Sequence, residues 1–101
     1  MPHRPIKKIF DMPAWMDRID DTCLYEMLVE AIVARGAALR AGILQHPRCL
    51  PIFQSADETV DQIAYGRYQG QTACRKAADA LRKYQQAHDC MFPPGRHRGS
   101  R

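Results

Sequence analysis

The stretch from Ser55 to Cys90 constrains the fold most, because no proline interrupts it before Pro93. Ser55 is followed three residues later by Glu58, which matches the capping box that is typical of a helix start. Proline is the residue that interrupts a helix most strongly. The sequence therefore predicts one long helix over about residues 56–90.

A second helix is predicted over about residues 22–44. The residues Asp20, Asp21 and Thr22 supply candidate N-caps, and acidic side chains suit the positive end of a helix dipole. Apolar residues then recur around most of the helical circumference, and only a narrow side is polar. Such a helix is typical of a central position or of an oligomer interface.

The remaining segments are short. Pro13 favours a short helix over about residues 13–19, because proline suits the first turn of a helix. Residues 1–10 are basic and contain two prolines, which predicts an extended N-terminal arm. Residues 45–54, with two further prolines, are expected to be a connector without regular helix. Residues 1–94 then form one domain, and 95–101 a disordered basic tail.

Small residues at four-residue spacing suggest how the two long helices pack. Two helices approach closely only where the side chains between them are small. The small residues are Ala34, Ala38 and Gly42 on the first helix and Gly66, Gly70, Cys74 and Ala78 on the second. The predicted fold is all-α, an antiparallel hairpin of 22–44 and 56–90 whose register places Ala34 opposite Gly66.

In that hairpin the second helix extends beyond the first. Its overhang would expose Leu81, Tyr84 and Met91. Either the N-terminal segments or a second subunit would have to cover these side chains. Because a small apolar hairpin seldom buries its own surface, we expect self-association as a homodimer or a larger oligomer.

Positive charge is concentrated in the second half of the chain. Through Asp61 there are 7 Lys/Arg and 9 Asp/Glu, and from Gln62 onward there are 8 Lys/Arg and 2 Asp/Glu. A basic half favours an anionic partner, either nucleic acid, nucleotide or an acidic protein face, although a solvated helix face would look the same. The candidate partner-binding residues are Arg67, Tyr68, Gln71, Arg75, Arg82 and Lys83.

The four cysteines are scattered singly and form no CxxC pair. No signal peptide or apolar stretch long enough to span a membrane is evident, so we expect a cytoplasmic protein without membrane contact and cysteines that act as small buried hydrophobes. His46-x-x-Cys49 and His88-x-Cys90 contain zinc-ligand types, but their spacing is not a standard zinc pattern. No metal or cofactor is expected.

No catalytic motif is recognisable. The segment from Gly66 to Gly70 lacks the Gly-Lys-Ser/Thr ending of a phosphate loop, and the adjacent acidic residues resemble helix-start acids. The sequence therefore favours a small non-enzymatic interaction protein that binds and modulates another macromolecule, as a regulator or an inhibitor. The alternative is a nucleic-acid or nucleotide-binding protein that uses the basic face of the second helix.

Overall fold

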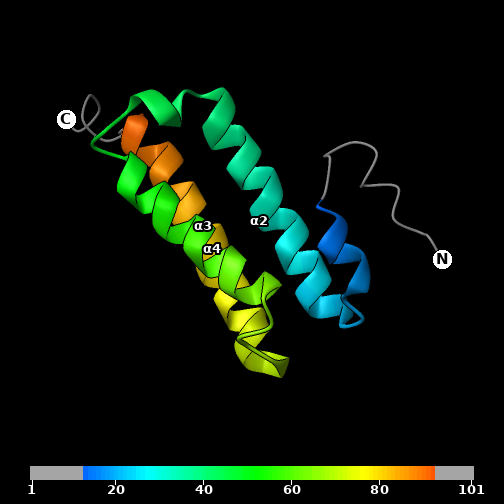
Figure 1. Ribbon diagram of the computed structural model, residues 1–101. Helices are drawn as coiled ribbons and strands as arrows, with labels where there is room; N and C mark the ends of the chain where they lie inside the picture. Colours follow the sequence, from blue (N-terminus) through cyan, green and yellow to red (C-terminus); the bar gives the residue numbers. More distant parts are fainter. Residues whose placement is uncertain (1–12, 93–101) are drawn as a thin grey trace, which may run out of the picture.

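The computed structural model describes residues 13–92, and this part of the chain is helical without strands. It contains the 3-10 helices η1 (Ala14–Arg18) and η2 (Ile43–Gln45) and the α-helices α2 (Thr22–Arg40), α3 (Leu50–Ala64) and α4 (Gly70–Met91) (Figure 1). The all-α class is thus confirmed. The predicted N-terminal arm and basic tail lie outside the described residues.

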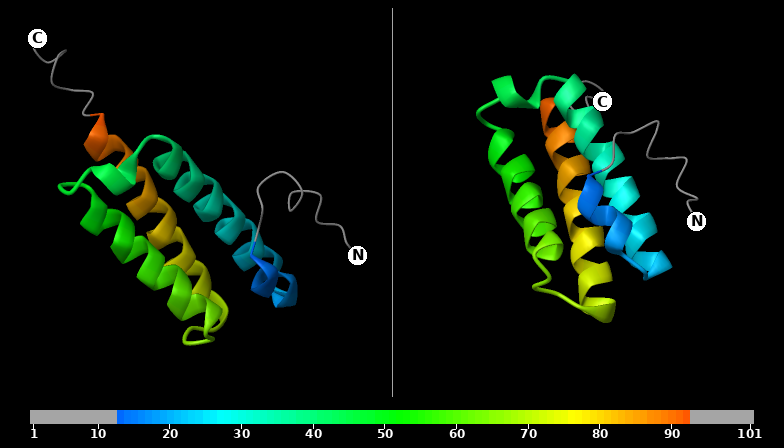
Figure 2. Two further views of the ribbon diagram at one scale, coloured as in Figure 1. Left: turned by 45° about the horizontal axis from the view of Figure 1, so that its top comes forward. Right: turned by 45° about the vertical axis from the view of Figure 1, so that its right-hand side comes forward.

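The three α-helices lie side by side, with α4 packed along both α2 and α3 (Figures 1 and 2). The chain ascends through α2, descends through α3 and ascends again through α4, so α2 and α4 run in the same direction. Early residues of α2 accordingly share a core cluster with early residues of α4, as Leu28 does with Ala77. The hairpin arrangement is therefore confirmed in part: its antiparallel pair is α3 with α4.

The single helix predicted over 56–90 is wrong, because the chain turns at Gly66. The N–H of Gly66 donates to Ile63 O at 3.0 Å, and the N–H of Arg67 donates to Gln62 O at 3.0 Å. This pair of bonds is a Schellman motif, which places a left-handed residue directly after the helix end. Gly66 has φ +79°, a conformation that glycine adopts without the steric cost of a Cβ atom.

The predicted connector and helix start are also wrong. The helix α3 begins at Leu50, five residues before Ser55, and Pro51 lies in its first turn. Proline is tolerated there because the first N–H groups of a helix have no partner within the helix. Ser55 therefore lies inside α3, where its backbone oxygen accepts a bond from Thr59 Oγ1 at 3.2 Å.

The helix α2 begins as predicted and ends earlier than predicted. Its N-cap is Asp21, whose side chain accepts a bond from the N–H of Leu24 at 3.1 Å. It ends at Arg40 rather than near residue 44, because Gly42 adopts φ +94° directly after the C-cap. The preceding short helix is the 3-10 helix η1, and its Met16 is fully buried against α2 and α4.

The core runs along one face of α4 that is rich in alanine. Its buried residues are Ala73, Ala77, Ala80, Tyr84, Ala87 and Met91. They recur at alternating intervals of four and three, which keeps side chains on one face of a helix. Alanine adds little bulk, and both α2 and α3 pack against this helix.

The predicted packing seam is largely wrong. A Cβ atom at Gly66 or at Gly70 would meet nothing within 4 Å, so neither glycine lies against a helix. Gly42 lies in the turn after α2, and Ala78 is only half-buried. Ala38 is fully buried, Ala34 packs against the core from a half-buried position, and Cys74 contacts Cys23.

The predicted exposed overhang does not form, because α3 folds back along α4. Tyr84 is fully buried, and Met91 retains only 8% of its exposure. Leu81 is half-buried beside the core. Of the three side chains whose predicted exposure suggests a second subunit, only Leu81 therefore remains partly exposed.

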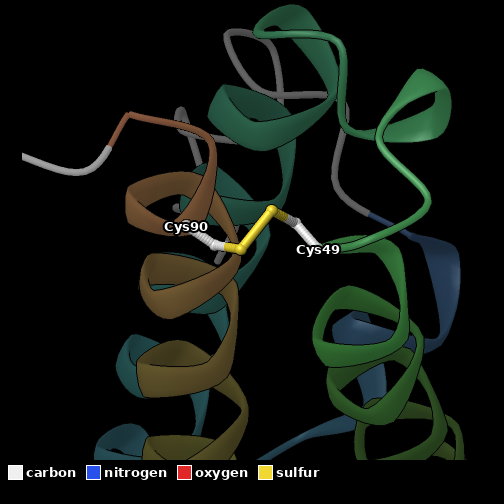
Figure 3. Close-up of a disulfide and its surroundings, with 2 residues drawn as sticks. All are labelled: Cys49 and Cys90. Atoms are coloured by element: carbon white, nitrogen blue, oxygen red, sulfur yellow. A yellow bond between two sulfur atoms is a disulfide. The ribbon is translucent and has the colours of Figure 1, made fainter.

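A disulfide joins Cys49 to Cys90, which links the start of α3 to the end of α4 (Figure 3). The Cα atoms are 5.8 Å apart across a sequence separation of 41 residues. The expectation that the cysteines are unpaired apolar residues is wrong at these two positions. That expectation rests on the scattered spacing of the cysteines and on the lack of a signal peptide, and neither shows that the fold brings residues 49 and 90 together.

The turn at Gly66 can be tested with two glycine substitutions. We expect Gly66→Ala to lower the free energy of unfolding by about 1 kcal/mol, because alanine is strained at positive φ. Gly36→Ala is the matched control inside α2, where the new Cβ would meet only the flexible end of Arg40 at 3.4 Å. We expect Gly36→Ala to be stabilising by about 0.5–1 kcal/mol.

Urea denaturation of the wild type and both variants measures these changes. If residues 56–90 formed one continuous helix, Gly66→Ala would be stabilising as well. Stabilisation by Gly66→Ala would thus contradict the turn.

Candidate functional site

A groove runs between α2 and α4 and has a volume of about 620 Å³. Its apolar lining comes from Val29, Val33, Ala34 and Ala37 on α2 and from Leu81 and Tyr84 on α4. Val33, Ala37 and Leu81 are only partly buried. The short alanine side chains leave room between the two helices, so this apolar surface is open to solvent.

The rim of this groove is polar and partly acidic. It is formed by Glu30 on α2 and by Gln85, His88 and Asp89 on α4. Glu30, Gln85 and Asp89 are exposed, and His88 Nδ1 lies 3.5 Å from Asp89 Oδ1. An apolar surface with a polar rim is the arrangement that marks many protein-interaction sites.

A polar cluster beneath the groove connects all three α-helices. Arg35 on α2 donates to Asp57 on α3 through Nε at 2.8 Å and through Nη2 at 3.3 Å. The hydroxyl of Tyr84 on α4 donates to the same carboxylate. Two bonds from a planar guanidinium fix the orientation of a carboxylate better than one, so Asp57 is held in place between the other two helices.

Aromatic contacts complete this cluster. The rings of Phe53 and Tyr84 meet edge to face, with centroids 5.3 Å apart and an interplanar angle of 63°. The guanidinium carbon of Arg35 lies 5.4 Å from the centroid of Phe53. Both geometries are favourable for aromatic and cation–π attraction.

The cluster changes the acidity of two of its members. Burial, followed by the hydrogen bond to Asp57, raises the pKa of Tyr84 far above its usual value. The hydrogen bond with Asp57 is also the main reason that the pKa of Arg35 is raised. Tyr84 therefore remains a protonated donor and Arg35 a cation throughout the neutral range.

The structure places the predicted partner-binding residues in different environments. Tyr68 donates from its hydroxyl to Gln62 Oε1 at 2.7 Å, and Lys83 Nζ bonds Ser55 Oγ on α3 at 2.8 Å. Arg82 forms an ion pair with Asp79. The other three, namely Arg67, Gln71 and Arg75, are exposed.

Arg75 and Arg82 do lie together, in a hollow of about 430 Å³ on α4. The hollow also includes Lys76, which the sequence-based set omitted. The ammonium of Lys76 lies 5.1 Å from the centroid of the Tyr68 ring. The sequence signal for including Lys76 is its position directly after Arg75, and the structure shows that both side chains border the same hollow.

The two His/Cys pairs lie at the same end of the bundle. Cys49 and Cys90 are joined to each other, so their sulfurs are not available as thiolate ligands. Among residues 13–92, no group of three or more His, Cys, Asp or Glu side chains is arranged to hold a metal ion. Within the same range, no helix is both long and apolar enough to cross a membrane.

Comparisons of the chain with protein-family models, with curated proteins and with solved structures find no match.

The buried Tyr84 hydroxyl predicts a pH dependence of stability. The unfolded chain releases the tyrosine proton near pH 10, whereas the folded chain retains it. The unfolded state therefore binds fewer protons above about pH 10, and the stabilisation falls there by up to about 1.4 kcal/mol per pH unit. Below pH 10 the stabilisation is fully present.

We expect Tyr84→Phe to lower the free energy of unfolding by about 1 kcal/mol at neutral pH, because one buried hydrogen bond is lost. The difference between wild type and variant should fall and change sign between pH 10 and 11.5, because the loss of up to about 1.4 kcal/mol per pH unit exceeds the hydrogen-bond contribution. The other tyrosines are present in both proteins, so their ionisation cancels in the difference. Chemical denaturation at a series of pH values measures it. A difference that stays constant over this range would rule out a raised pKa at Tyr84.

Proposed function

We propose that the protein is a non-enzymatic helical interaction protein that binds and modulates another macromolecule, as a regulator or an inhibitor. The groove between α2 and α4 is the observation that carries this proposal. Its apolar lining is continuous across two helices and partly open to solvent. A partner helix that buried an apolar face there would remove that surface from water.

The occupant that fits the groove best is an amphipathic helix of a partner protein with basic residues beside its apolar face. The groove is bordered by parallel helices, a geometry that accepts a third helix laid along them. Glu30 and Asp89 place negative charge on its rim. Complementary charges favour encounter with a basic partner and select against acidic ones.

Self-association is part of the proposal and is supported by exposed apolar side chains at the end of the bundle where α4 finishes. Leu44 is 59% exposed and Phe92 is 54% exposed. Leu44 lies in η2, and Phe92 directly follows α4, whose end packs beside η2 (Figure 1). Two large apolar side chains at one end would be covered if that end met a second copy.

The alternative function, binding of nucleic acid or a nucleotide, is supported by the basic hollow on α4. Arg75, Lys76 and Arg82 border it, and arginine suits phosphate oxygens. Asp79 also lies in this hollow and pairs with Arg82, which offsets part of its positive charge. The alternative is therefore the weaker of the two.

Replacing either of two alanines by glutamine separates these functions. Ala37 lies in the groove and Ala78 in the basic hollow, and both are half-buried helical positions. We expect Ala37→Gln to reduce capture of a discrete protein partner from nuclease-treated lysate at least tenfold, because the longer side chain fills the groove. Ala78→Gln, which adds the same bulk without changing the charge, should leave capture unchanged.

Circular dichroism of both variants verifies that they fold. Capture that disappears with nuclease or high salt, or that falls only in Ala78→Gln, would favour nucleic-acid binding instead. Light scattering on the same three proteins should give the mass of a dimer or larger in each. A monomeric mass at high concentration would contradict self-association.

A further inference from the structure

Two further cysteine sulfurs are in contact at the end of the bundle opposite to the Cys49–Cys90 disulfide. Cys23 Sγ lies 3.1 Å from Cys74 Sγ, although the residues are 51 positions apart in the sequence. Cys23 lies in the first turn of α2 and Cys74 near the start of α4. The two helices run in the same direction, so both starts lie at one end (Figure 1).

The contact is close to the geometry of a bond. A disulfide has sulfur atoms about 2.05 Å apart, so an approach of about 1 Å would close it. Cys23 is exposed and Cys74 is half-buried, whereas Cys49 retains only 2% of its exposure. A small reagent can therefore reach this pair directly from solvent.

We infer that Cys23 and Cys74 are a covalent modification site: they form a second disulfide, between the start of α2 and the start of α4, by exchange with a small-molecule disulfide. The exposed Cys23 thiolate attacks the reagent, forms a mixed disulfide and releases one thiolate. The Cys74 sulfur then attacks Cys23 Sγ, breaks the mixed disulfide and releases the second thiolate. The two protein thiols lose two protons and two electrons, and the reagent becomes two thiols.

The environment of Cys74 suits the second step rather than the first. The contact with the Cys23 thiol, then burial and then the charge of Asp21 raise the pKa of Cys74. Because Cys23 is the more exposed of the two, the reagent meets Cys23 first. Once Cys23 carries a mixed disulfide, the thiol–thiol contact that raised this pKa no longer exists.

The existing disulfide provides independent support. Disulfides form and persist mainly in oxidising compartments, and Cys49 and Cys90 are already joined. A second pair in contact in the same chain meets the same oxidant. Cys49–Cys90 connects α3 to α4, and Cys23–Cys74 would connect α2 to α4, so every α-helix would be covalently linked. The cytoplasmic location stays a prediction from the sequence, and this chemistry weighs against it.

Glutathione disulfide is the probe for the test, applied to the full chain. After exposure to it, the protein is acidified, digested without reductant and examined by mass spectrometry. We expect a cross-linked peptide pair containing Cys23 and Cys74 and no retained glutathione. In Cys74→Ser the second step is blocked, so one glutathionyl group should remain on Cys23.

Cys23→Ser serves as the reciprocal variant should Cys74→Ser lose its helical circular dichroism signal, and it should retain glutathione on Cys74. Three results would overturn the inference. The wild type could keep both thiols unmodified, or it could retain glutathione as the serine variant does. The third such result is a cross-link of Cys23 or Cys74 to Cys49 or Cys90.

Discussion

The carboxylate of Asp57 accepts hydrogen bonds from both of the other α-helices, and the arrangement of the bundle depends on it. Arg35 approaches from α2 and Tyr84 from α4, while Phe53, one turn before Asp57 on α3, packs against both. The buried face of α4 consists mostly of small alanine side chains, which constrain the rotation of a helix less than large ones. The directional bonds to Asp57 add that orientation. Because the side chains of Arg35 and Asp57 remain 40% and 33% exposed, the cluster positions the helices without isolating an unpaired charge.

The same packing creates the groove. Tyr84 faces Asp57 with its hydroxyl, and it also contributes to the apolar lining between α2 and α4. The helix α3 packs along α4, whereas the groove between α2 and α4 contains no residue of α3 and stays partly open. The open surface thus follows from a three-helix arrangement in which the third helix covers one face only.

Part of this fold could be predicted from the sequence. Helical class, the Asp21 N-cap and the helix end before Pro93 follow from local rules. The turn at Gly66 was missed because a glycine can be a packing residue or a helix C-cap. The four-residue spacing from Gly66 to Ala78 suggests a packing seam. Each step of four residues, however, advances about 40° around a helix, so such a series does not stay on one face. Alternating intervals of four and three residues from Ala73 to Met91 mark the buried face of α4. This pattern is weak in the sequence, because most of its members are alanine and not large apolar residues.

The candidate site was predictable only in part, because its geometry depends on the turn at Gly66. Basic residues are visible in a sequence, so Arg75 and Arg82 belong to the predicted set, and Asp79, the partner of Arg82, lies three residues away in the same helix. The contact of Lys83 with Ser55 depends on the turn, because it joins α4 to α3. The groove combines residues from two helices whose relative direction depends on that turn. Each cysteine contact likewise joins residues more than 40 positions apart, and no local pattern reveals which of them meet.

The most direct test of this account is the distance between the rings of Phe53 and Tyr84 in solution. The structure places their centroids 5.3 Å apart, so nuclear Overhauser contacts between the two rings should be strong. In one continuous helix over 56–90, Tyr84 would lie about 40 Å along the axis from the helix start, and no such contact could form. Observing these contacts would support the three-helix bundle, and their absence in the folded monomeric or oligomeric chain would contradict it.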